Sequence, residues 1–196
     1  MKNIATILFA IISMVGCTSI QNEPAIAFRG ISLGDQPIVG MKKIEALKED
    51  ILFIPNTITS GYVLPNEAKN ISNTKVDNVI YEYYHNKLFK IRIKLSQTPK
   101  HHCTDSDDIK NGLEMTYEIK MDWKSKSYTE NSFIAQWRGR ENWVTYICNH
   151  SFGLKSITLE NRKLGHEALK KEDEIERINS EARAQKVKAD LMNPIN

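Results

Sequence analysis

The clearest pattern in the chain is a period-two alternation of apolar and polar residues between positions 76 and 95. The apolar positions are Val79, Tyr81 and Tyr83 in a first run and Phe89, Ile91, Ile93 and Leu95 in a second. Such alternation is typical of a β-strand with one buried face. Because residues 85–87 separate the two runs, we predict a β-hairpin whose sheet buries a single side.

The opposite face of the second run carries Lys90, Arg92 and Lys94. We interpret these residues as solvated charges on the outer face of the sheet. A basic binding face is the alternative.

Three further β candidates occupy residues 132–140, 142–150 and 154–161, with turn residues around 139–142 and 151–153. Short apolar runs separated by tight turns favour an antiparallel meander.

Apolar residues at helical spacing predict two helices inside the domain. Asp35 can cap the first, whose apolar positions recur every third residue at Ile38, Met41, Ile44 and Leu47. The second begins after polar residues 104–108 and repeats every fourth residue at Ile109, Leu113, Tyr117 and Met121.

Residues 166–191 are rich in Ala, Glu, Lys and Arg and predict a long helix. An approximate heptad stripe is formed by Ala168, Ile175, Ile178, Ala182 and Ala189, and it is interrupted by Lys171 and Gln185. We expect a largely solvated tail helix, with a partner-binding helix as the alternative.

The N-terminus places Lys2 before an apolar run from Ile4 to Val15. This run is shorter than the about 20 residues of a membrane span and is typical of a signal peptide. It ends in Met14-Val15-Gly16-Cys17, which resembles the lipobox of bacterial lipoproteins. The resemblance implies cleavage before Cys17 and attachment of palmitate or related acyl chains to this residue. A secretory signal peptide in which Cys17 is incidental, or an uncleaved anchor, is the alternative.

Thr18 follows the cysteine, where an aspartate commonly retains bacterial lipoproteins at the inner membrane. The resemblance therefore implies a lipid-anchored protein of the outer membrane that faces the periplasm.

The segment Phe28-Arg29-Gly30-Ile31-Ser32-Leu33-Gly34, followed by a capped helix and a hairpin, carries a second resemblance. This order, over residues 27–96, resembles the small α/β domains of envelope lipoproteins, including the small lipoprotein subunit of the β-barrel assembly machinery. It implies helices packed on an antiparallel sheet and transfers no functional residue.

The chain has 27 Lys and Arg residues against 24 Asp and Glu residues, and removal of Lys2 with the signal peptide leaves a formal charge of +2. The two signs are interspersed, so we predict no nucleic-acid partner. Cys103 and Cys148 are the remaining cysteines. In an oxidising compartment they predict one disulfide, with two separate buried thiols as the alternative.

Residues 100–108 hold His101, His102 and Cys103 beside carboxylates, all of which are types of zinc ligand. The histidines lack the spacing of a helical metal pair, so we predict no metal site and no cofactor. A Cys103 nucleophile with His150 or His166 as its base is the enzymatic alternative.

The three tryptophans allow two interpretations. We expect Trp123, Trp137 and Trp143, together with Tyr146, to anchor the core, and the alternative is a ligand surface.

The resulting prediction is an α+β protein with an antiparallel sheet (hairpin plus meander) packed against two helices, and a long C-terminal helix. Its parts are a lipoprotein signal peptide (1–17), a tether (18–25), a periplasmic domain (26–164) and a helical tail (165–196). We expect no catalytic residue and a role in binding an envelope protein or supporting assembly. A lipid-anchored hydrolase or metal-dependent enzyme that uses the His/Cys region is the alternative.

Overall fold

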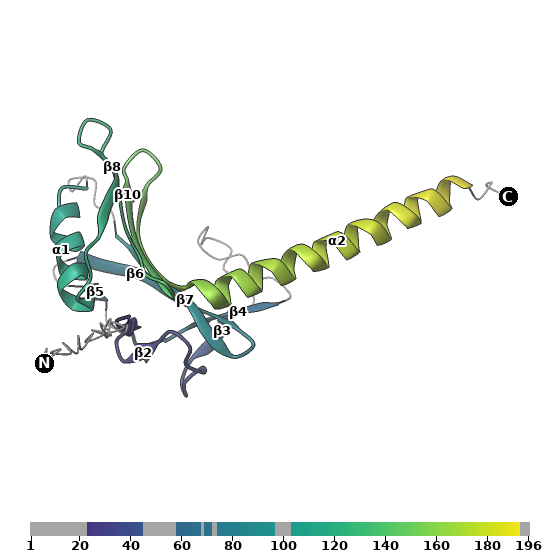
Figure 1. Ribbon diagram of the computed structural model, residues 1–196, viewed down its shortest axis with the longest axis horizontal. Coiled ribbons are helices and arrows are strands. Elements are labelled where there is room, and N and C mark those ends of the chain that lie inside the picture. The colour runs from purple at the N-terminus through teal and green to yellow at the C-terminus, as the bar shows by residue number, and fades with distance from the viewer. Residues whose placement is uncertain (1–22, 45–57, 68, 72–73, 97–102, 193–196) are drawn as a thin grey trace, which may run out of the picture.

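The computed structural model describes residues 23–44, 58–67, 69–71, 74–96 and 103–192, which are organised by one antiparallel sheet (Figure 1). Its strands lie in the order β3 (Lys42–Ile44), β4 (Thr59–Val63), β6 (Thr74–Tyr84), β7 (Lys87–Leu95), β11 (Leu154–Asn161), β10 (Asn142–Asn149), β9 (Ser132–Arg138) and β8 (Asp122–Ser127). β5 (Asn70–Ile71) pairs with the start of β6, and β1 (Ala27–Phe28) and β2 (Ile31–Ser32) form a separate small hairpin. With α1 (Ser106–Tyr117) and the long α2 (Arg162–Met192), the predicted α+β class is confirmed.

The predicted hairpin is β6 and β7, and the predicted meander is β9, β10 and β11. His85 and Asn86 join the hairpin strands with φ angles of 49° and 59°. Positive φ at both central residues is typical of the type I′ turn, whose twist matches that of the strands it connects.

A β-bulge at Phe89 corrects one detail of the predicted pattern. Glu82 lies opposite Lys90 and Tyr83 lies opposite Leu88, so Phe89 is an extra residue on β7. The bulge moves Phe89 away from the face that holds Ile91 and brings it against Tyr84.

The main core lies on one face of the sheet. Tyr81, Ile91, Val144 and Leu159 are fully buried there, and Tyr117 of α1 and Phe28 of the β1–β2 hairpin pack over the same core. The expectation of a single buried side is wrong for part of the sheet. Ile80 and Ile44 are buried on the other face, as are Tyr84 and Phe89 beneath the start of α2.

The helix predicted from Asp35 does not form in residues 35–44. Residues 42–44 are instead strand β3, and Gly40 has a φ of 93°, which a right-handed helix does not accommodate. Gly34 donates its backbone N–H to the carbonyl of Leu88, and the Asp35 carbonyl accepts from the N–H of Leu88. These bonds hold the segment to the hairpin, and Leu47 lies outside the described residues.

α2 follows β11 directly, as Figure 1 shows. The Asn161 side chain accepts a hydrogen bond from the backbone N–H of Leu164 at 3.0 Å, which satisfies one of the free donors in the first turn. Leu164 and Ala168 then pack on Tyr84 and Phe89. At 1.5 Å per residue the helix is about 46 Å long, so most of it extends beyond this contact. Within the described part of the chain, neither helix has the length and apolar composition needed to cross a bilayer.

Candidate functional site

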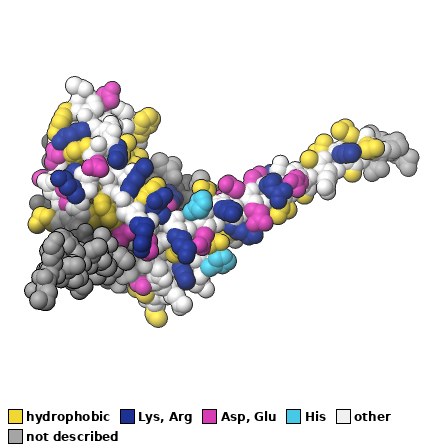
Figure 2. Space-filling view, viewed as in Figure 1, with side chains coloured by type: hydrophobic (Ala, Val, Ile, Leu, Met, Phe, Trp, Pro, Cys, Tyr) yellow, Lys and Arg dark blue, Asp and Glu magenta, His cyan; other side chains and the backbone are white. Residues whose placement is uncertain are grey.

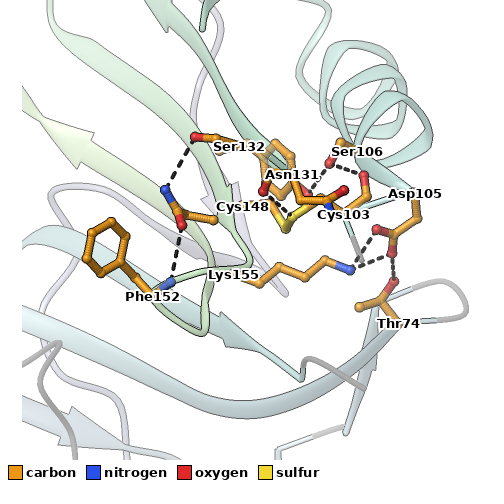
Figure 3. The surroundings of a disulfide bond; sticks show 11 residues. Thr74, Cys103, Asp105, Ser106, Asn131, Ser132, Cys148, Phe152 and Lys155 are labelled. Carbon is orange, nitrogen blue, oxygen red and sulfur yellow. Dashed lines mark hydrogen bonds and ion pairs between the residues drawn. A yellow bond between two sulfur atoms is a disulfide. The ribbon is translucent and has the colours of Figure 1, made fainter. Parts of the chain in front are cut away.

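The structure brings Cys103 and Cys148 together as a disulfide with Cα atoms 5.8 Å apart (Figure 3). Cys103 lies just before α1 and Cys148 lies on β10, and both are almost completely buried. The bond therefore ties the start of α1 to the end of β10. A sulfur held in this bond is neither a nucleophile nor a metal ligand.

Polar side chains beside the disulfide form a second tie to the sheet. Lys155 is 3% exposed, and its Nζ lies 2.7 and 2.6 Å from the two carboxylate oxygens of Asp105, the residue that precedes α1. Thr74 donates to the same carboxylate at 3.2 Å. Asp105 occupies the N-cap position of α1, but its side chain makes no capping bond and binds Lys155 instead.

A buried hydroxyl pair completes this region. Ser106 donates to the Cys103 carbonyl at 2.6 Å, and its Oγ lies 2.9 Å from the hydroxyl of Tyr146. Burial raises the pKa of Tyr146, so this phenol is neutral at physiological pH. The polar groups around the disulfide bind one another and hold α1 in place. This arrangement is typical of a structural junction between a helix and a sheet.

The histidines of the enzymatic alternative are not gathered at this junction. His150 and His166 are exposed at opposite ends of β11, which has eight residues and is about 26 Å long at 3.3 Å per residue. His85 packs against Tyr84 in the hairpin turn. His101 and His102 lie outside the described residues. Among the residues that are described, no group of three or more His, Cys, Asp or Glu side chains is placed to hold a metal ion.

The basic face of β7 is an ion-paired surface. Lys90 lies 3.4 Å from Glu160, and Arg92 pairs with Glu82 on the neighbouring strand. Burial raises the pKa of Glu82, and the nearby Arg92 opposes this shift. Since acidic neighbours engage two of the three cations, the pattern favours the interpretation as charges of the outer face.

The tryptophans differ in role. Trp123 and Trp137 pack partly buried against the main core, as predicted. Trp143 instead lies on the outer face, where the guanidinium groups of Arg138 and Arg162 are 4.7 and 4.5 Å from its ring centre. This distance is that of a cation–π contact.

α2 is the largest exposed feature that the structure describes. Ala168 is buried and Ile175 is half-buried, whereas the described side chains beyond Ile175 are exposed. Ile178 is 50% exposed. The stripe that begins with Leu164 and Ala168 at the root recurs at alternating steps of three and four residues through Lys171, Ile175, Ile178, Ala182, Gln185 and Ala189. The face that docks α2 on the sheet therefore continues, uncovered by the described residues, along the rest of the helix.

Ion pairs between exposed side chains lie along α2. They join Lys171 to Glu174, Arg177 to Glu181, and Arg183 to Glu176. Such pairs stabilise a helix only slightly. Apart from Lys171, the paired side chains lie outside the heptad stripe, so the rest of the stripe remains available for contact with another molecule.

Comparison with known proteins gave no matching family model, no similar curated protein and no similar solved structure.

Proposed function

We propose that the chain is a lipid-anchored protein of the bacterial cell envelope that acts by binding another envelope protein and has no catalytic role. The anchor is Cys17, and the location is the periplasmic side of the outer membrane, both inferred from the lipobox resemblance. The binding element is α2. The observation that carries this proposal is the heptad stripe, which is buried at Ala168 and exposed from Ile178 onward.

The chemistry of the stripe indicates the kind of partner. Ala182 and Ala189 are small, so the backbone of a partner helix can approach α2 closely. Ile175 and Ile178 supply the apolar centre, and Lys171 favours an acidic or carbonyl group opposite it. A helix or helix-lined groove of an envelope protein fits this surface, and the mixed charges visible in Figure 2 give no concentrated basic track for nucleic acid.

Photo-crosslinking in intact cells tests the binding element. A photoreactive amino acid at Ile178 or Ala182 should form one discrete adduct with the same protein, and the adduct should disappear when Ile175→Asp is added. Ser180 is the matched control, because it is exposed on the opposite face of the same helix turn. Equal adducts from Ile178 and Ser180, or none from either stripe position, would contradict the proposal.

The histidines before α1 test the enzymatic alternative. Substitution of His101 and His102 together by Ala should leave the cellular role of the protein intact, since the proposed function uses neither side chain. Loss of that role in a correctly folded variant would favour the enzyme. Stoichiometric metal retained by the purified protein would do the same.

A further inference from the structure

Glu23 fixes the start of the described chain to one particular end of the sheet. Its carboxylate accepts hydrogen bonds from the backbone N–H groups of Glu141 and Asn142 at 2.7 and 2.6 Å. Glu141 lies in the turn between β9 and β10, and Asn142 is the first residue of β10. At Gly139, in the same turn, an added Cβ would overlap the Glu23 carboxylate, so the missing side chain makes room for this contact.

The covalent distance from this contact to Cys17 is short. Glu23 follows Cys17 by six positions, and six fully extended residue steps span at most about 22 Å. If Cys17 carries the membrane anchor, as in the proposed function, the Glu23 backbone remains within about that distance of the lipid surface, whatever the conformation of the intervening residues. The β9–β10 turn lies one glutamate side chain and one hydrogen bond further away.

Basic side chains surround the turn that is tethered in this way. Arg138 and Arg140 lie on or beside it, and Arg162 and Lys163 begin α2 at the same end of the sheet, because Asn142 pairs with Asn161. All four are exposed. Of the acidic groups nearby, Glu23 binds two backbone amides, Glu160 pairs with Lys90, and Glu141 pairs with Arg140. Figure 2 shows Lys and Arg side chains gathered where α2 leaves the sheet.

Trp143 adds an aromatic ring to these cations. Its ring lies against Arg138 and Arg162 and is partly exposed. Tryptophan combines a large apolar body with one polar N–H, and it is enriched at the level of lipid headgroups in membrane proteins. Cations beside such a ring fit a surface that is both anionic and partly apolar.

We propose that Arg138, Arg140, Trp143, Arg162 and Lys163 form a membrane-facing patch that binds anionic phospholipid headgroups and orients the protein on its lipid anchor. This inference rests on the proposed function. The tether brings the patch to the lipid surface, and the charges select the orientation, since each Lys or Arg near an anionic surface strengthens binding about fivefold. The disulfide end of β10 then points away from the membrane.

Fluorescence quenching on vesicles tests the patch. The mature lipoprotein has no free thiol if Cys17 is acylated and Cys103 is bonded to Cys148, so one added cysteine can be labelled specifically. A fluorophore at Glu141→Cys reports the tethered turn, and one at Ser151→Cys reports the turn at the opposite end of β10. Vesicles of phosphatidylethanolamine with or without phosphatidylglycerol carry a nitroxide on the headgroup.

The patch predicts strong quenching at position 141, weak quenching at 151, and a smaller difference without phosphatidylglycerol, where only the tether keeps position 141 near the lipid. The double variant Arg140→Glu with Lys163→Glu should have fewer molecules with the patch on the membrane. The ratio of molecules whose patch contacts the membrane to molecules whose patch does not should fall by more than about tenfold. These two side chains are exposed, so the variant leaves the core intact. Lys124→Glu with Lys186→Glu changes the net charge equally at sites away from the patch and should change nothing.

Two results would overturn the inference while leaving the anchor intact. One is equal quenching at both positions on vesicles that retain the protein. The other is quenching that does not change in the variant Arg140→Glu with Lys163→Glu, together with loss of the α2 crosslinks in that variant. This combination would assign the patch to a protein partner. Protein that does not float with vesicles of either composition would overturn both this inference and the proposed anchor.

Discussion

The cross-link between Cys103 and Cys148 is the strongest single constraint on this domain. It joins residues 45 positions apart, and both side chains are buried. Closing a loop of this length stabilises the folded state by about 4 kcal/mol through the entropy of the unfolded chain. That is a large part of the about 5 to 15 kcal/mol that separates folded from unfolded domains.

Reduction of the disulfide should therefore lower the melting temperature markedly. Cys103→Ser and Cys148→Ser should each destabilise the domain as much as the double substitution, because either one removes the same bond. Thermal unfolding with and without reductant measures the effect. Non-reducing peptide mapping that finds Cys103 and Cys148 as two free thiols, in protein isolated from cells without reductant, would contradict the assignment.

Glu67 gives a prediction about pH. Its carboxylate accepts a hydrogen bond from the Tyr81 hydroxyl at 2.5 Å and lies 3.3 Å from Arg29. Burial raises the pKa of Glu67 above its ordinary value, although both neighbours oppose the shift. A raised pKa means that the folded state binds the proton more tightly than the unfolded state. The stability that this group contributes is therefore fully present at low pH and is lost as pH rises through the raised pKa.

Glu67→Gln removes this titration and retains an acceptor for Tyr81. The free energy of unfolding of the wild type minus that of the variant should decrease between about pH 4 and pH 7. Urea denaturation at the two pH values gives the difference. A value that stays constant or increases with pH would show that burial does not govern this carboxyl group.

The first turns of α2 pack on the sheet, and the rest of the helix is exposed. Ala168 in the packed part and Ala182 in the exposed part occupy the same heptad position. Ala168 is 4% exposed against Tyr84 and Phe89, whereas Ala182 is exposed. Ala168→Glu forces a charge into an apolar contact and should destabilise the protein by about 2 kcal/mol or more. Ala182→Glu should change stability by less than about 0.5 kcal/mol. Chemical denaturation compares them, and equal effects would mean that the root does not pack as described.

The contact between the Glu23 carboxylate and the start of β10 gives a second prediction about an element. Glu23→Ala removes the acceptor of the Glu141 and Asn142 amides, so these amides should exchange their hydrogens with solvent faster. Glu23→Gln keeps one acceptor oxygen and should have a smaller effect. Hydrogen exchange at Glu141 and Asn142 measures the effect. Unchanged exchange in Glu23→Ala would show that the Glu23 carboxylate does not protect the turn.

Elements with a clear periodic pattern could be predicted from the sequence, and those set by distant contacts could not. The hairpin and the meander alternate apolar and polar residues, so β6, β7 and β9 to β11 were expected. β8 was missed because it is a polar edge strand, Asp122–Ser127, in which little apolar surface is buried. The helical spacing after Asp35 misled because a glycine with positive φ and the bonds to Leu88 hold that segment in a turn followed by strand β3.

The same limit applies to the candidate surfaces. The stripe on α2 is visible in the sequence because a helix repeats locally. The patch around Trp143 is not, since it depends on the contact of Glu23 with residues 118 and 119 positions away and on the pairing of Asn142 with Asn161. No local pattern encodes such a contact.

At the scale of the whole molecule, the proposed anchor holds a sheet domain to a membrane near one end of its strands. Figure 1 shows the β8–β9 and β10–β11 turns at the opposite end from the start of α2. The N–H of His150 donates to the carbonyl of Asn131 between these two turns. The disulfide and the exposed Phe152 and Tyr128 lie toward this end, which the proposed orientation directs away from the membrane.

The anchor itself predicts the effect of one substitution. Cys17→Ala should prevent acylation and cleavage by the lipoprotein signal peptidase, because the proposed anchor is attached to this thiol. The precursor should accumulate, and fatty-acid label should be absent from it while the wild type is labelled. Normal processing of Cys17→Ala would indicate an ordinary secretory signal peptide.

Mass spectrometry of the N-terminal peptide of the mature protein, isolated from the membrane fraction, tests the central claim most directly. The account predicts a peptide that begins at Cys17 and carries acyl chains on that residue. A mature chain that begins elsewhere, or that begins at Cys17 with no attached lipid, would contradict it.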